Sequence, residues 1–202
     1  MGGLLIISRG IDALNQKIGV VAIYLVLFAA LVSAFNATVR YALLGLITLS
    51  RNFQQIPGLD GFIQWYSTSS NSLTEAQWYM FAAMVLLGAA YTLKLNEHVR
   101  VDLFYGSASE RTRLWIDLWG TIFFLLPMCL ILLYLTWPWF LDAWRSGERS
   151  ASSGGLVRWP VKLMLPLGFG LVALQGISEI IKCVAALTGF QRREYTYEKP
   201  LQ

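Results

Sequence analysis

Residues 18–39 read IGVVAIYLVLFAALVSAFNATV, and this stretch decides the fold class. Its 22 residues include no charged side chain, and at about 1.5 Å per residue a helix of this length crosses the hydrocarbon core of a bilayer. Backbone polar groups in lipid must be hydrogen-bonded within the protein, so a spanning segment is a helix or a strand of a closed barrel. The stretch lacks the strict alternation of polar and apolar residues that a barrel strand shows. It therefore predicts a transmembrane helix.

Three further uncharged runs follow, at residues 76–93, 118–141 and 163–178. The run at 118–141 has full spanning length and the run at 76–93 is near the lower limit. The last run reaches that length only if its helix continues past Glu179 and Lys182. The 202-residue chain is 56% hydrophobic and only 14% charged, with a mean hydropathy of +0.53, whereas about a quarter of a soluble domain is charged. The sequence predicts an all-α integral membrane protein with four transmembrane helices.

An amphipathic segment precedes the first run. Its apolar residues recur at helical spacing: Leu4, Ile7, Ile11, Leu14 and Ile18. This pattern predicts an N-terminal amphipathic helix that lies in the cytoplasmic membrane interface. An extension of the first span is the alternative. A cleaved signal peptide is disfavoured, because the apolar run is longer than that of a typical signal peptide and apolar sequence resumes after Arg40.

We expect one membrane domain without internal repeats. The predicted segments are an interfacial helix at 1–17, a first span at 18–45, a periplasmic loop at 50–74, a second span at 75–95, a cytoplasmic loop at 96–113, a third span at 114–140, a periplasmic loop at 142–160, a fourth span at 162–188 and a cytoplasmic tail at 189–202. Ten basic residues fall on the side of the termini and six on the other. Cytoplasmic loops are enriched in Lys and Arg, so we expect both termini in the cytoplasm. The reverse orientation is the alternative, since the third gap is itself basic.

The residues that could carry catalysis are sparse. His98 is the only histidine, and Cys129 and Cys183 lack the spacing of a metal site or a disulfide. The sequence therefore predicts no catalytic residue, no metal, no cofactor and no enzymatic activity. The net charge of +4 comes from basic residues spread along the predicted membrane edges. This distribution favours contact with phospholipid head groups and no binding of nucleic acid.

A dense set of charges follows the second span. Helical spacing would bring Glu97 near Arg100, and His98 near Asp102. These residues either end a helix at the lipid head groups or form a docking site for another polypeptide.

Arginines mark the opposite side. A helix that starts at Lys17 carries Arg40 about 33 Å, to the outer interface, where its side chain can reach lipid phosphates. If the helix continues to residue 49, Arg40 lies in apolar surroundings and needs a partner, for which Asn36 is the candidate. Arg145 and Arg149, in the 142–160 loop, are candidate contacts with a periplasmic protein, and a solvated loop is the alternative.

Three motifs carry a family resemblance by their order. They are NATVRY at 36–41, HVRVDL at 98–103, and WPVK at 159–162 followed by PLGF at 166–169. Together they resemble the small membrane subunit of TRAP transporters, the DctQ-like or Q subunit, and they add Trp159 and Pro160 to the candidate interface residues. The run SGGLVRWPVK at 153–162 resembles the branch annotated for mannitol, chloroaromatic compounds or 2-oxo acids. The 50–74 loop is longer than in many members of this family.

The resemblance implies a small scaffold subunit of a tripartite ATP-independent periplasmic transporter in the bacterial inner membrane. Its implied partners are a large membrane subunit, M, a periplasmic substrate-binding protein and phospholipids. In such a system M moves small organic acids by a sodium-coupled, elevator-type motion, and the Q subunit supports its static part. Residues that bind substrate or sodium then belong to M. A self-contained small transporter or channel that acts as a homo-oligomer is the alternative.

Overall fold

The computed structural model describes residues 2–52, 58–98, 105–152 and 154–190. Its elements are α1 (Gly2–Asn52), α2 (Leu59–Leu95), α3 (Glu110–Gly120), a π-helical turn η1 (Thr121–Leu125), α4 (Leu126–Ser146) and α5 (Trp159–Leu187). Within these described ranges there are no strands beyond an isolated bridge between Arg149 and Val157. Four helical stretches are long and apolar enough to cross a membrane. The predicted all-α class and its four spans are confirmed.

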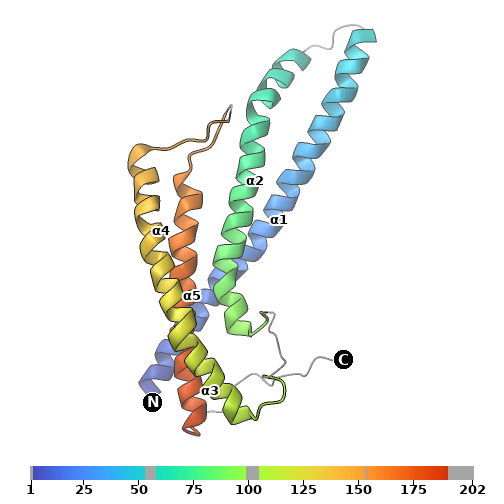
Figure 1. The fold of residues 1–202 in the computed structure, drawn as a ribbon. Coiled ribbons are helices and arrows are strands. Elements are labelled where there is room, and N and C mark those ends of the chain that lie inside the picture. Colours follow the sequence, from blue (N-terminus) through green and yellow to red (C-terminus); the bar gives the residue numbers. More distant parts are fainter. Residues whose placement is uncertain (1, 53–57, 99–104, 153, 191–202) are drawn as a thin grey trace.

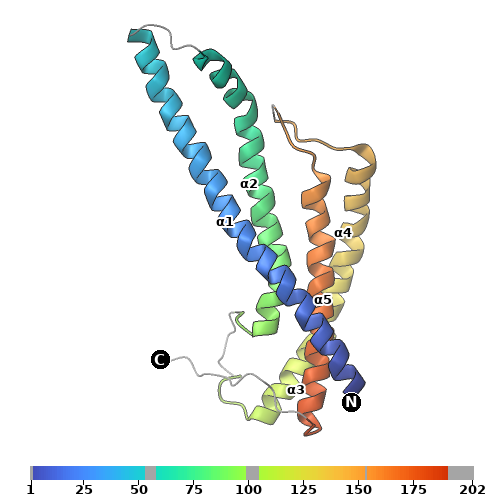
Figure 2. The same ribbon diagram turned by 180° about the vertical axis from the view of Figure 1, so that it is seen from behind.

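The helices form two antiparallel pairs (Figures 1 and 2). α1 and α2 run side by side as one hairpin, and α4 and α5 form the other. The beginning of α1 crosses α5 near the end of the molecule that also holds α3, and the far ends of the two hairpins diverge. α5 contributes more buried residues than any other described helix. It is therefore the element against which the others pack.

The first helix has no break between the predicted interfacial segment and the first span. α1 runs from Gly2 to Asn52, so residues 2–17 are helical, as predicted, and are continuous with the first span. No proline lies in this stretch to interrupt the i to i−4 hydrogen bonds. The buried positions Ser8, Asn15, Ala22 and Ala29 recur every seven residues, a spacing that keeps one face of a long helix in contact with its neighbours.

The second helix begins earlier than predicted. Residues 59–74, which we expected within a loop, are the first turns of α2. The hydroxyls of Thr68 and Thr74 donate to the carbonyls of Gln64 and Ser70, each at 3.0 Å, so polar residues are satisfied within the helix. Tyr66 packs with Leu43 of α1 in a small apolar cluster. Local hydrogen bonds and packing on α1 thus allow a helix where composition suggested a loop.

The third span, Glu110–Ser146, contains one irregular turn. Within it, the backbone N–H of Leu126 donates to the carbonyl of Thr121, five residues earlier. Pro127 follows directly, and a proline in a regular helix has no N–H to donate and clashes with the carbonyl four residues before it. The wider π turn accommodates this clash. A Cβ on Gly176 of α5 would lie 2.7 Å from Leu125 Cδ2, so glycine permits the close approach of α5 here.

Candidate functional site

The predicted interface residues lie at opposite ends of the structure, so they form several surfaces rather than one site. Asn36 and Arg40 are on α1, Glu97 and His98 follow α2, Arg145 and Arg149 flank the end of α4, and Trp159 and Pro160 begin α5. Arg100 and Asp102 lie outside the described residues. The predicted pairing within 97–102 is therefore outside what the structure describes.

Asn36 binds α2 and not Arg40. Its Oδ1 accepts a hydrogen bond from the Tyr66 hydroxyl at 2.7 Å, and its Nδ2 donates to Thr74 Oγ1 at 3.2 Å. Arg40 is exposed on the surface of α1. The suggested sharing of Arg40 by Asn36 is thus replaced by a contact that joins the two helices of the first hairpin.

Trp159 and Pro160 form the start of α5. Trp159 meets Trp144 of α4 edge-on, with ring centroids 4.5 Å apart. Pro160 lies in the first turn, where a backbone N–H has no partner within the helix and a proline is therefore tolerated. These two residues join the ends of α4 and α5.

A polar network that the sequence analysis did not identify joins α1 to α5. We call it the N-terminal clasp, and it consists of Ser8, Asp12, Asn15, Gln175, Ser178, Glu179 and Lys182. Four of these side chains, on Ser8, Asn15, Gln175 and Ser178, are at most 2% exposed. The sequence signal is a polar residue at every third or fourth position on both helices. It was missed because the partners are separated by 160 to 170 residues.

The clasp is a connected set of hydrogen bonds. Ser178 Oγ lies 2.7 Å from Ser8 Oγ and donates to Asp12 Oδ1 at 2.8 Å. Asn15 Nδ2 donates to Gln175 Oε1 at 2.7 Å, and Gln175 Nε2 donates to Asp12 Oδ1 at 2.9 Å. Buried polar groups are stabilised by such pairing, and Asn15 Oδ1 is the buried side-chain oxygen of the clasp that has no hydrogen-bond partner among the described residues. The network therefore fixes how α1 and α5 meet.

Lys182 supplies the positive charge of the clasp. Its Nζ lies 2.8 Å from Asp12 Oδ2 and 2.9 Å from Glu179 Oε1. Glu179 and Lys182 are three residues apart on α5, a spacing that places their side chains on the same face of the helix. One ammonium group thus serves two carboxylates from different helices.

A second set of polar contacts lies where the 147–158 loop meets α2. We call it the loop clasp: Ser72 and Glu75 of α2, with the backbone of Gly154 and Leu156. Ser72 donates to the Gly154 carbonyl, and Glu75 Oε2 accepts from the Leu156 N–H at 2.8 Å. Gly154 has φ of +72°, and a Cβ there would lie 2.4 Å from the Thr68 carbonyl oxygen. Only glycine fits this turn without strain.

Glu148 holds the same loop to the first turn of α5. Its carboxylate pairs with Lys162 and with Arg158, the latter at 3.2 Å. The hydrogen bond from Lys162, then that from Arg158, lowers the pKa of Glu148 below its ordinary value of 4.5. Lys162 also lies 4.4 Å from the centroid of the Trp139 ring. Ion pairs therefore hold the 147–158 loop to the start of α5 at this end of the second hairpin.

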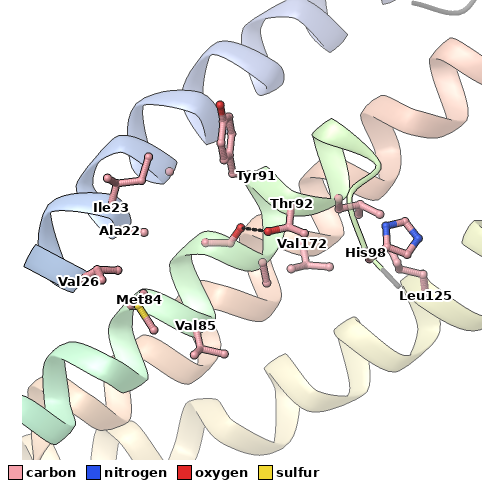
Figure 3. A pocket seen from close by; sticks show the side chains of 14 residues that line it. Ala22, Ile23, Val26, Met84, Val85, Tyr91, Thr92, His98, Leu125 and Val172 are labelled. Carbon is pink, nitrogen blue, oxygen red and sulfur yellow. Dashed lines mark hydrogen bonds between the residues drawn. The ribbon is translucent and has the colours of Figure 1, made fainter. Parts of the chain in front are cut away.

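Between the hairpins lies a mainly apolar cleft of about 670 Å³ (Figure 3). α1 contributes Ala22, Ile23 and Val26, and α2 contributes Met84 and Val85, with Leu125 and Val172 across from them. His98, Tyr91 and Thr92 supply the polar groups at one end. The described residues include no cluster of His, Cys, Asp or Glu that could hold a metal. The lining of the cleft suits an apolar occupant.

Residues 66–186 match the family described as tripartite ATP-independent periplasmic transporters, DctQ component. The chain belongs to this family. The match runs from the second turn of α2 almost to the end of α5 and includes the HVRVDL, WPVK and PLGF motifs. No curated protein and no solved structure matches the chain. As a DctQ component with four apolar helices, it is a multi-pass membrane subunit of a transporter, and DctQ is not an enzyme family.

Part of the structure lies outside the DctQ match. The NATVRY motif and the α1 half of the N-terminal clasp precede residue 66. The α5 half of the clasp lies within the matched range. The contact between them thus joins a DctQ-matching helix to a segment outside the match.

Proposed function

We propose that the chain is the small scaffold subunit of a TRAP transporter in the bacterial inner membrane. It supports a large M subunit that takes up small organic acids, delivered by a periplasmic binding protein, through a sodium-coupled elevator motion. The observation that carries this proposal is the DctQ match over residues 66–186. A tripartite, ATP-independent system needs membrane and periplasmic partners, and this chain supplies one membrane component.

The continuity of the spans supports a scaffold role. Ion and substrate sites of secondary transporters are built from helices interrupted near the middle of the membrane. Here the described part of each long helix continues without such an interruption, and the one π turn, at 121–125, is explained by Pro127. A frame of continuous helices resists bending and suits a subunit against which another part moves.

The outward-facing surface supports contact with lipid and with M. Large apolar side chains on α1 and α4 are widely exposed, for example Tyr41 and Tyr134, each at 75%, and Phe124 on η1 at 78%. A surface this apolar is stable only against lipid or another apolar surface. We propose that M covers part of it and that phospholipid covers the rest.

The predicted interface residues receive roles in the same proposal. With both termini in the cytoplasm, Glu97, His98, Arg100 and Asp102 face M or lipid head groups on the cytoplasmic side. Because α1 continues to Asn52 and Asn36 binds α2, the exposed Arg40 side chain needs another partner, and we propose that it extends to lipid phosphates or to a group on M. Arg145 and Arg149 are exposed near the end of α4, where positive charge would attract an acidic surface of the binding protein.

Co-purification tests the assembly. A tagged chain is expressed with a candidate M subunit from a neighbouring coding region, and the detergent-solubilised complex is captured through the tag. We expect M to be recovered with the chain in fixed proportion, and an unrelated four-helix membrane protein with the same tag serves as the control. Recovery of a homo-oligomer of this chain with no M subunit would contradict the scaffold proposal and favour a self-contained transporter.

Single-cysteine labelling tests the orientation. Cys129 and Cys183 are first replaced by alanine, because both are buried native thiols. A cysteine in place of exposed Arg149 should react with a membrane-impermeant maleimide in intact spheroplasts, and a cysteine in place of exposed Glu97 should react only after lysis. The opposite result would reverse the topology.

A further inference from the structure

The start of α1 is held mainly by polar contacts. Among its first sixteen residues, the buried ones that the structure describes are Leu5, Ser8 and Asn15. The apolar side chains of Leu4 and Ile7 instead point away from the protein and are 49% and 55% exposed. Apolar packing therefore contributes little to placing this segment on α5.

Charge balance in the clasp depends on one residue. The side chains of Asp12, Glu179 and Lys182 are 18%, 8% and 19% exposed. Two carboxylates held this close repel each other, and burial removes the water that would otherwise screen them. Lys182 Nζ contacts both. Removing the ammonium group would leave two poorly solvated negative charges on the facing helices.

The clasp lies where it can determine how the two hairpins are oriented relative to each other. α1 crosses α5 at the clasp, and the two hairpins diverge from this crossing (Figure 2). Further along, α2 meets α5 closely at Gly168, where a Cβ would lie 2.8 Å from Leu86 Cβ. A change in the crossing would thus rotate α1 and α2 about this close contact.

We propose that Lys182 is a positioning residue whose ammonium group, shared by Asp12 and Glu179, locks the start of α1 across α5 and so sets the angle between the α1–α2 and α4–α5 hairpins. The clasp is a conformational device of this chain and does not depend on the proposed transport role.

Three variants separate charge from packing. Lys182→Met keeps the length of the side chain but leaves both carboxylates uncompensated, and we expect its Tm to fall by about 10 °C. The triple variant Asp12→Asn, Glu179→Gln, Lys182→Met removes all three charges at similar shape, and it should recover at least half of that loss. Lys94→Met is the matched control. It removes another lysine that contacts α1, but the contact that it removes is an exposed hydrogen bond from Lys94 Nζ to Gln16 Oε1 at 3.0 Å.

One distance measurement and one disulfide cross-link test the geometry directly. Spin labels on cysteines in place of exposed Ala42 on α1 and Asp142 on α4 report the spread of the hairpins, in the background without native cysteines. We expect Lys182→Met to shift or broaden this distance, and Lys182→Arg and the triple variant to retain the original one. Cysteines in place of Ser8 and Ser178 should form a disulfide under mild oxidation and leave the distance unchanged.

Each outcome decides the proposal. It is overturned if Lys182→Met leaves Tm and the label distance unchanged, or if the triple variant is as impaired as the single variant, which would assign Lys182 a packing role. If Lys182→Met does not accumulate, the triple variant still decides: a triple variant that folds with the original label distance supports the charge role of Lys182, and one that also fails to accumulate overturns it. Failure of the Ser8 and Ser178 cysteines to link would show that α1 does not lie on α5.

Discussion

At the scale of single residues, buried hydrogen bonds determine how the long helices pair. Asn36 illustrates this, since its side chain binds two residues of α2. Sequence spacing placed Asn36 near Arg40 because it reports neighbours on one helix only. The partner on the next helix depends on the turn between the helices, and this turn was predicted to be longer than it is.

Removing the Tyr66 hydroxyl tests the Asn36 contact. Tyr66→Phe deletes the 2.7 Å bond to Asn36 Oδ1 while the ring keeps its apolar contacts. We expect a loss of about 1 kcal/mol in stability, measured by thermal unfolding in detergent. Tyr24→Phe is the matched control, because Tyr24 is 57% exposed on α1 and should be neutral. Equal stability of the two variants would contradict a structural role for the bond.

The ion pairs of Glu148, in the loop after α4, should make the stability of the protein depend on pH. Its pKa is lowered in the folded protein by Lys162 and then by Arg158, so its contribution to stability is present above the ordinary value of 4.5. That contribution is lost as the pH falls through the folded pKa. Unfolding followed between about pH 6 and pH 3 should show this loss. At the upper end of this pH range, Glu148→Gln should be less stable than the original protein, and its stability should depend less steeply on pH. Identical profiles of stability against pH would exclude these ion pairs as a source of stability.

At the scale of elements, apolar runs predicted the four spans but not their ends. The runs are explicit in the sequence because lipid requires about 20 consecutive apolar residues. α2 extends beyond its run because Thr68 and Thr74 bond to their own helix. α1 extends toward its N-terminus because its polar face binds α5 and its apolar face points outward. The N-terminal pattern predicted the helix correctly, but it did not predict that the polar face of this helix packs on α5.

Close contacts between helices depend on glycine. A Cβ on Gly168 would lie 2.8 Å from Leu86 Cβ and 2.9 Å from the Leu86 carbonyl oxygen. We expect Gly168→Ala to separate α2 from α5 and to cost about 1–3 kcal/mol. Gly120→Ala is the control, because nothing lies within 4 Å of its Cβ position. Thermal unfolding of both variants checks this, and a neutral Gly168→Ala would show that the helices are further apart than described.

At the scale of the whole molecule, the two hairpins meet at two polar clasps and at the close contact of Gly168 with Leu86, and an apolar cleft lies between them. The N-terminal clasp fixes one crossing, and the loop clasp holds α2 to the second hairpin. The family could be predicted from three short motifs, and the DctQ match confirms it. The two clasps could not be predicted from the sequence, because the residues that they bring together from different segments lie 81 to 170 positions apart and no local pattern joins them.

Transport by reconstituted proteins tests the scaffold role most directly. Liposomes containing this chain alone, the candidate M subunit alone, or both together are given a sodium gradient, the periplasmic binding protein and a panel of labelled organic acids that includes 2-oxo acids. We expect sodium-dependent uptake when both membrane subunits are present, and none with this chain alone. Uptake by this chain without the M subunit would contradict the account.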